Sequence, residues 1–171
     1  PRLAAQLTLF LLDQRSTEVV VHLFGHSQFF SELIIRDPEL VTWLRGQPPA
    51  LDRMTWAEQL GELLAAETTE AGWLAVVRRF RRREMLRIVY NDIVLDSPLE
   101  SITLDLSHLA DACVEAVLRL ACRELTSQFG VPRDPETEAA ASYVVLALGK
   151  LGGQELNYSS DSALMCLYDV A

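Results

Sequence analysis

The stretch that decides the fold is YVVLALGKLGGQELNYSSDSALMCLYD, which runs from Tyr143 to Asp169. It contains an apolar run, a glycine-rich turn, a short polar segment with one aspartate, and a second apolar run. Both apolar runs are short, and the first is rich in β-branched residues and ends at Gly149, which is typical of a buried strand. The stretch therefore predicts a strand, a turn with a short helix, and a second strand.

The turn Gly149-Lys150-Leu151-Gly152-Gly153 has the residue types of a phosphate site. Glycines let backbone N–H groups approach an anion, a helix start adds a partial positive charge, and Lys150 adds a mobile one. A turn of this kind also serves simply to reverse the chain, and this one lacks the spacing of a Walker A loop. Both interpretations stay open at this point.

Asp161 follows two serines and is expected to open the second strand. Strand residues two apart share a face and lie about 6.5 Å from each other. An Asp-x-Asp pattern there would hold two divalent ions against phosphate oxygens. The second position is Ala163 in this sequence, so half of the carboxylate pair that two-metal chemistry needs is absent.

The chain before residue 130 carries helix signals. Asp37 and Pro38 mark the start of one short helix and Gly46 marks its end. Apolar spacing predicts a longer amphipathic helix between Thr69 and Asp92. The segment 97–100 reads SPLE, a capping-box pattern, and a further start is expected at Ser107, in a stripe that lasts until Gly130.

These signals predict a mainly α fold: a helical bundle over residues 1–135, followed over 136–171 by the truncated opening of an α/β domain. The segment GVPRDPETEAA, residues 130–140, has the prolines and charges of a linker or surface loop. We expect the chain to be part of a longer protein, because its second apolar run needs neighbouring strands.

Composition excludes several classes of function. The net charge of −9 argues against non-specific nucleic-acid binding, which needs a basic surface. No apolar stretch reaches the length of a membrane span, and we expect a cytoplasmic protein. Cys113, Cys122 and Cys166 are odd in number and lie in apolar sequence, so each is predicted to be a buried free thiol.

One basic cluster stands out in this acidic chain, at Arg78, Arg79, Arg81, Arg82, Arg83 and Arg87. Helical spacing places Arg79, Arg83 and Arg87 on one face. That face either contacts an acidic partner or a phosphate, or is a solvated face paired with acidic side chains. The three histidines, His22, His26 and His108, lack the company of metal ligands, and the three tryptophans, Trp43, Trp56 and Trp73, fit helix-packing positions.

The segment GKLGGQELNYSSD, followed by LMCLYD, closely resembles the motif of the glutamine synthetase adenylyltransferase/adenylyl-removing enzymes. These bacterial proteins carry two nucleotidyltransferase domains of the polymerase β-like superfamily. Carried over by position, the resemblance gives roles in phosphate binding and metal binding to six residues. Gly149 and Lys150 match the Gly-Ser-like turn, Gly152 and Gly153 the glycines after it, Ser160 the residue before the acids, and Asp161 the first metal-binding aspartate.

The resemblance extends upstream through FFSELIIRDPEL, VVRRFRRREMLRIVYNDI and LSHLADACVEAVL, and so covers most of the chain from Phe29 onward. The form ELNxSSD and the arginine-rich segment are more like the adenylyl-removing half than the adenylylating half. The resemblance implies Mg²⁺ or Mn²⁺ and ATP or ADP in intact relatives. It also implies glutamine synthetase as the partner and the PII signalling protein as a possible regulator.

Two departures from the family pattern bear on activity. Ala163 replaces the second carboxylate, and the chain stops before the strand expected to bring a third. We therefore expect this chain not to catalyse nucleotidyl transfer. The alternatives that remain are a degenerate module that binds glutamine synthetase or a regulatory protein, and another member of the same superfamily, which the helical region and the GKLGG form disfavour.

Overall fold

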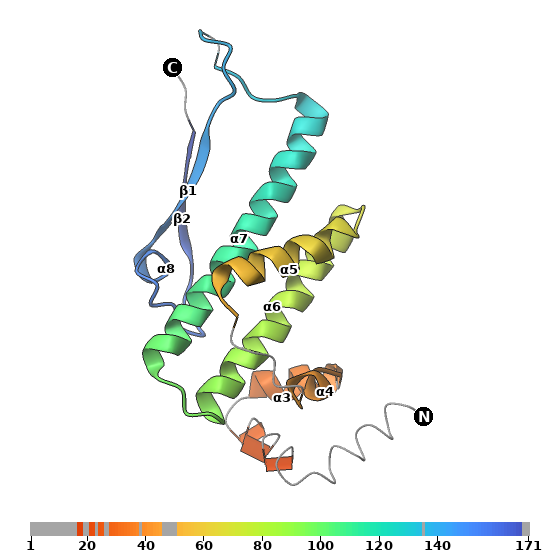
Figure 1. The fold of residues 1–171 in the computed structure, drawn as a ribbon, viewed down its shortest axis with the longest axis vertical. Coiled ribbons are helices and arrows are strands. Elements are labelled where there is room, and N and C mark those ends of the chain that lie inside the picture. Colours follow the sequence, from red (N-terminus) through yellow and green to blue (C-terminus); the bar gives the residue numbers. More distant parts are fainter. Residues whose placement is uncertain are drawn as a thin grey trace.

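The computed structural model describes residues 17–18, 21–22, 24–25, 28–37, 39–45, 51–134 and 136–168. Two long helices, α6 and α7, lie side by side, with α5 across them and a pair of strands along α7 (Figure 1). The predicted mainly α fold, followed by strand, turn, short helix and strand, is confirmed. The elements are α3 (Gln28–Arg36), α4 (Glu39–Arg45), α5 (Arg53–Ala65), α6 (Glu70–Ile93), α7 (Leu99–Phe129), β1 (Tyr143–Leu148), α8 (Gly149–Gly152) and β2 (Ala163–Tyr168).

Side-chain caps fix the starts of α5 and α6. The carboxylate of Asp52 accepts the N–H of Thr55 at 2.8 Å, and the hydroxyl of Thr69 accepts the N–H of Gly72 at 3.1 Å. Each cap satisfies a backbone donor that has no partner within its helix. The helix predicted between Thr69 and Asp92 is confirmed.

Helix α7 is one continuous helix of 31 residues. It begins at Leu99, within the predicted SPLE segment, so that start is confirmed, whereas the second start predicted at Ser107 is wrong. Pro98 occupies its N-cap and has no side-chain donor or acceptor, so the predicted capping-box hydrogen bond is not formed. The backbone N–H of Ser97 donates to the carbonyl of Asn91 at the end of α6. Ser107 lies in mid-helix, where its hydroxyl donates to the carbonyl of Thr103 at 2.8 Å. A serine that bonds back to the preceding turn is compatible with a helix interior.

The core forms where α5, α6 and α7 meet, and the N-terminal helices α3 and α4 add to it. Trp56, Phe80, Leu86 and Ile88 are almost completely buried there. Trp56 and Trp73 are core residues and Trp43 is partly buried against the core, so the predicted packing role of the tryptophans is confirmed.

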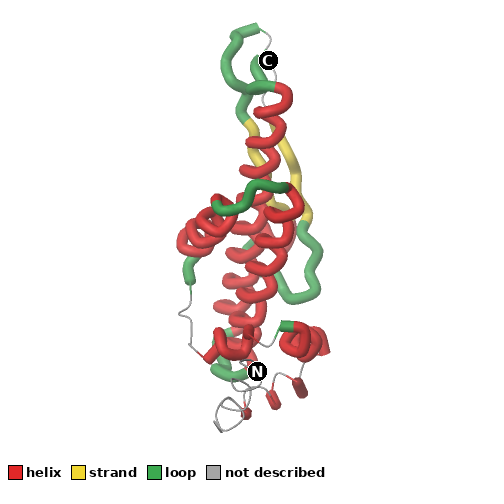
Figure 2. Tube along the Cα trace, turned by 90° about the vertical axis from the view of Figure 1, so that its right-hand side faces the viewer, coloured by secondary structure: helices red, strands yellow, loops and turns green. Residues whose placement is uncertain are grey.

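Strands β1 and β2 form an antiparallel hairpin, paired from Tyr143 with Tyr168 to Leu148 with Ala163. Figure 2, turned by 90° from Figure 1, shows the hairpin running along the C-terminal half of α7. The strands are predicted to be buried, but Val144 and Leu146 are 49% and 42% exposed. This expectation is wrong for the described residues, because a two-stranded sheet packed on one helix leaves one face without a cover.

The hairpin is joined to the helical core by its connecting segment. Leu151 and Leu156 are buried in the same core as the helices, at 2% and 7% exposure. The predicted division at residues 135 and 136 therefore does not separate two cores in the described part of the chain, and the two-domain organisation stays a prediction. The segment before the hairpin is an exposed turn, as predicted, with a bridge between Arg133 and Ala140.

The cysteine prediction is half right. All three thiols are free, but Cys122 and Cys166 are exposed and only Cys113 is partly buried. Cys122 lies on the part of α7 that extends beyond the core, and Cys166 lies in the thin hairpin. Three residues on which sequence predictions rest, His26, Pro38 and Gly46, lie outside the described residues.

Within the part of the chain that the structure describes, no helix combines the length and the apolar character that crossing a membrane requires.

Candidate functional site

The glycine turn lies in the connection between the two strands. The last strand pair joins Leu148 to Ala163. Gly149 follows Leu148 directly, and Asp161 lies two residues before Ala163. The strand pairing therefore brings the glycine turn and Asp161 to the same end of the hairpin, as the hypothesis of a phosphate site requires.

Two glycines of the turn are required by the path of the backbone. Gly149 has a φ of 60°, in the left-handed region that residues with a Cβ rarely adopt. Gly152 passes so close to β1 that a Cβ would meet the carbonyl oxygen of Ala147 and lie 3.0 Å from its carbon. Chain reversal alone accounts for glycine at these two positions, so they do not by themselves indicate a ligand.

The other predicted phosphate-binding residues differ in whether their hydrogen-bonding groups are free to bind an anion. Gly153 already donates its N–H to the carbonyl of Gly149 at 2.9 Å. The hydroxyl of Ser160 donates to the side chain of Asn157 and accepts the backbone N–H of Asn157 at 3.2 Å. Lys150 is exposed on α8. Of these three, Lys150 is the group left to reach an anion, because the other two close local turns.

The carboxylates near the turn do not form a two-ion site. Asp161 is exposed and lies just before β2, which begins at Ala163 rather than at Asp161 as predicted. Among the described residues, no three Asp, Glu, His or Cys side chains lie close enough together to hold a metal ion. Divalent ions in proteins take several oxygen ligands. The residues present therefore do not fit the Mg²⁺ or Mn²⁺ pair that the resemblance implies.

Two contacts that the sequence analysis missed hold the segment between the turn and Asp161. The buried hydroxyl of Ser107, on α7, accepts the N–H of Leu156 at 3.1 Å. The hydroxyl of Tyr158 donates to the carboxylate of Asp92, on α6, at 2.8 Å. The available signal was the presence of Leu151 and Leu156 in an otherwise polar segment, which marks it as packed against a core rather than solvated.

The phenol of Tyr158 remains a donor over the whole physiological pH range. Its pKa is raised, first because burial disfavours the phenolate, and then because Asp92 and Asp105 place negative charge beside it. A protonated phenol beside a carboxylate makes a charge-assisted hydrogen bond. The contact between Tyr158 and Asp92 therefore keeps its donor proton throughout that range.

Comparison with known proteins decides the family. The sequence model of glutamate-ammonia ligase adenylyltransferase matches residues 17–171 of the chain. The chain belongs to this family. The resemblance that the glycine motif indicates is thereby confirmed.

Curated relatives of this adenylyltransferase family cover most of the chain. The bifunctional glutamine synthetase adenylyltransferase/adenylyl-removing enzyme of Shewanella loihica is 34% identical over 166 residues, which are 96% of this chain and 17% of that enzyme. The enzyme of the same name from Nitrosococcus oceani is 35% identical over 148 residues, which are 85% of this chain and 15% of that enzyme. The chain thus spans only a small part of the length of these relatives.

The arginine cluster of this adenylyltransferase-family chain is divided between surface and core. Arg79 is 75% exposed and lies 4.0 Å from Glu39, which fits the predicted solvated, paired face. Arg87 is 1% exposed and donates to the buried carboxylate of Glu84 at 3.0 Å. Arg83 donates to the same carboxylate and lies over the ring of Trp43. The prediction of one solvated face is therefore wrong for Arg87, because Glu84 draws it into the helix interface.

Glu84 is the centre of a buried polar cluster that joins three helices. The indole N–H of Trp56, on α5, donates to Glu84 at 3.0 Å, and the guanidinium of Arg87 stacks over the Trp56 ring. Arg87 also lies 3.8 Å from Asp105, on α7. Burial raises the pKa of Asp105, although the positive charge of Arg87 acts in the opposite direction.

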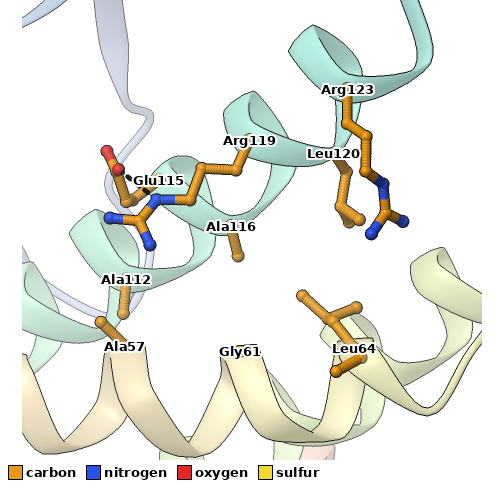
Figure 3. A pocket seen from close by; sticks show the side chains of 10 residues that line it. Ala57, Gly61, Leu64, Ala112, Glu115, Ala116, Arg119, Leu120 and Arg123 are labelled. Atoms are coloured by element: carbon orange, nitrogen blue, oxygen red, sulfur yellow. Dashed lines mark hydrogen bonds and ion pairs between the residues drawn. The ribbon is translucent and has the colours of Figure 1, made fainter. Parts of the chain in front are cut away.

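A cavity of about 210 Å³ lies between α5 and α7, away from the glycine turn (Figure 3). Small residues line it from both helices, with Gly61 on α5 facing Ala116 on α7, and Arg119 and Arg123 project from α7 beside it. Arg119 is bound to Glu115 at 2.7 Å, and Arg123 stacks on Trp73. Both guanidinium groups already have partners, so this cavity is a packing gap rather than a candidate site.

Proposed function

We propose that this chain is the helical region and the opening of a nucleotidyltransferase domain. The protein that contains it removes AMP from, or adds AMP to, a tyrosine of glutamine synthetase. The observation that carries the proposal is the position of the glycine turn and Asp161 at one end of the hairpin, in a chain of the adenylyltransferase family. The curated relatives, whose names state both activities, support the same substrate.

The adenylyl-removing activity is the one we assign to this domain, because its ELNYSSD segment and arginine-rich helix resemble that half of the family. In that reaction phosphate attacks the AMP-tyrosine bond, so that tyrosine leaves and ADP forms. Lys150 and the first N–H groups of α8 would face the phosphate oxygens that do not react. The PII signalling protein is the regulator that we propose on the same family grounds.

Ala163 supports a second candidate function. With one carboxylate the domain lacks the ligands that hold divalent ions during phosphoryl-type transfer. The chain would then be a degenerate module that recognises glutamine synthetase or a signalling protein and performs no chemistry itself. Both candidates use the same helices and differ only at the end of the hairpin.

The test restores the missing carboxylate in the full-length protein that contains this chain. Adenylylated glutamine synthetase, phosphate and Mg²⁺ are supplied, and ADP release is followed for the original protein and for Ala163→Asp. We expect release only from Ala163→Asp. Ala163→Asn is the matched control, because it adds a side chain of the same size without the charge.

Release from Ala163→Asp and none from Ala163→Asn would establish an adenylyl-removing domain that its present residues disable. No release from any of the three proteins would exclude this activity and favour the binding module. Release from the original protein would contradict the argument from the missing ligand.

A further inference from the structure

The segment from Gln154 to Ser160 leads from the glycine turn to Asp161, and most of it is exposed. It contains no helix or strand of its own. A short polar loop of this kind is normally among the least stable parts of a protein, because few buried contacts oppose its opening. Its position must therefore be set by contacts with other elements.

Two helices supply these contacts at points far away in the sequence. Asp92 lies near the C-terminal end of α6 and is 66 residues from Tyr158. Ser107 lies on α7 and is 49 residues from Leu156. The two accepting groups thus come from neighbouring helices and hold the segment at two residues only two positions apart.

Each contact is chemically specific. The hydroxyl of Ser107 uses its single proton on the carbonyl of Thr103 and so presents a lone pair to the N–H of Leu156. Both groups are buried, and a buried N–H without an acceptor is costly. The carboxylate of Asp92 can only accept, so the phenol of Tyr158 must donate, which fixes the direction of the second hydrogen bond.

We propose that Asp92 and Ser107 are positioning residues of the candidate site: the helical region holds the loop that carries Asp161 through them. The inference rests on the proposed function for the identity of the reaction. That Asp92 and Ser107 hold the loop in place is independent of the proposed function. The helices of this chain are thereby part of the site.

The first experiment measures hydrogen exchange of the backbone amides between Leu156 and Asp161 in the intact protein. Tyr158→Phe removes the donor hydroxyl, and Asp92→Ala removes its acceptor. Ser107→Ala removes the acceptor of the Leu156 N–H. Each is expected to accelerate exchange in this loop by about tenfold or more, since each breaks one of the two hydrogen bonds that hold the segment. Asp92→Asn keeps an acceptor oxygen and should restore most of the protection.

Matched controls separate positioning from general destabilisation. Tyr168→Phe makes the same chemical change at an exposed tyrosine of β2, and Ser101→Ala makes the same change as Ser107→Ala at an exposed serine of α7. Neither control should change exchange in the loop. Exchange in residues 120–129, at the C-terminal end of α7 and far along that helix from Ser107, should stay constant in all variants.

The second experiment places Tyr158→Phe in the Ala163→Asp protein and measures ADP release. A positioning role predicts a fall of kcat of about tenfold with KM for adenylylated glutamine synthetase unchanged, because the loop orients the reacting groups and does not bind the protein substrate. Unchanged exchange in the loop would overturn the proposal. Faster exchange with unchanged kcat would overturn its link to the reaction. If Ala163→Asp is inactive, the proposed function fails alone, and the exchange result still decides the positioning role.

Discussion

At the scale of single residues, the two glycines that follow each other in the turn differ sharply. A Cβ on Gly152 would meet the carbonyl group of Ala147, a backbone atom of β1 that cannot move without breaking the hairpin. A Cβ on Gly153 would have the carbonyl oxygen of Gly149 as its nearest neighbour, at 3.5 Å, which is ordinary contact. The sequence motif contains both glycines, but the backbone requires only the first.

Gly152→Ala is therefore expected to lower the free energy of unfolding by roughly 1–3 kcal/mol, the usual cost of forcing extra atoms into a packed site. Gly153→Ala is the matched control and should stay within about 0.5 kcal/mol of the original protein. Urea denaturation measures both. Equal losses for the two variants would show that the close approach to Ala147 is not what requires glycine.

Two cysteines on α7 give a residue-scale prediction about pH. Burial raises the pKa of the Cys113 thiol from 9.0 to about 11, and the nearby charge of Arg81 offsets this only in part. At pH 8 only about one Cys113 thiol in a thousand is then ionised. Iodoacetamide at pH 8 should modify the exposed Cys122 and leave Cys113 intact until denaturant is added, as peptide mass spectrometry can show.

The raised pKa of Cys113 also makes the stability of the protein depend on pH. Folding raises the pKa of Cys113. The contribution of this thiol to the free energy of unfolding is therefore complete below pH 9, the ordinary thiol pKa, and is lost as the pH rises towards 11. Cys113→Ala should remove this part of the alkaline loss of stability. Rapid alkylation of Cys113 in the folded protein would contradict the burial on which both expectations depend.

At the scale of elements, α5 contains a glycine in its interior that the packing does not require. A Cβ on Gly61 would meet no atom within 4 Å, since the residue borders the cavity between α5 and α7. Glycine in a helix interior costs roughly 0.5–1 kcal/mol relative to alanine. Gly61→Ala should therefore raise the free energy of unfolding by about that amount.

Gly72, in the first turn of α6, provides the contrast for this prediction. A Cβ there would meet the carboxylate of Glu67 and lie 2.9 Å from the hydroxyl of Thr69, the residue that caps the helix. Gly72→Ala should gain little or lose stability, because the gain in helix propensity is offset by a disturbed cap. If thermal unfolding shows equal gains for both variants, helix propensity alone decides, and the local geometry does not matter.

Element boundaries show where prediction from sequence succeeds and where it does not. The start of α6 follows from Thr69, because a capping hydroxyl and the N–H that it binds are three residues apart. The start of α7 follows from the SPLE segment, in which it lies. Ser107 marks no start, because it lies inside the helix and its hydroxyl serves a contact with Leu156. Local patterns reveal local hydrogen bonds and cannot reveal a competing distant partner.

At the scale of the whole molecule, Glu84 connects the helices on which the rest of the fold depends. Its carboxylate is fully buried and accepts from Trp56 on α5 and from Arg83 and Arg87 on α6. Glu84→Ala would leave the buried charge of Arg87 with Asp105 alone, 3.8 Å away. Removing one partner of a buried ion pair costs roughly 3–5 kcal/mol.

We expect a loss of about that size for Glu84→Ala in urea denaturation. The matched control is Glu62→Ala, which removes an exposed glutamate from α5 and should change the free energy of unfolding by no more than about 0.5 kcal/mol. A loss below about 1 kcal/mol for Glu84→Ala would show that the cluster contributes little net stability.

The residues of the candidate site were predictable from the sequence, but the contacts that hold them against the helices were not. Gly149, Lys150 and Asp161 are recognisable because they lie within one short stretch. The attachment of this segment to the helices is not recognisable from the sequence. Tyr158 and Leu156 bind residues of α6 and α7, and no sequence periodicity relates the two partners. The buried position of Arg87 was missed for the same reason, because the partner that holds it, Glu84, also needs Trp56 from another helix.

The attachment of this loop also bears on the order in which the chain folds. Residues 94–98 join α6 to α7, and closing so short a connection costs little chain entropy, so the two helices can pair early. Asp92 and Ser107 lie on either side of that connection, whereas their partners come from 66 and 49 residues away. Contacts between distant residues are slow to form. We therefore expect the docking surface on the helices to form before the loop docks, and the site around Asp161 to be assembled late in folding.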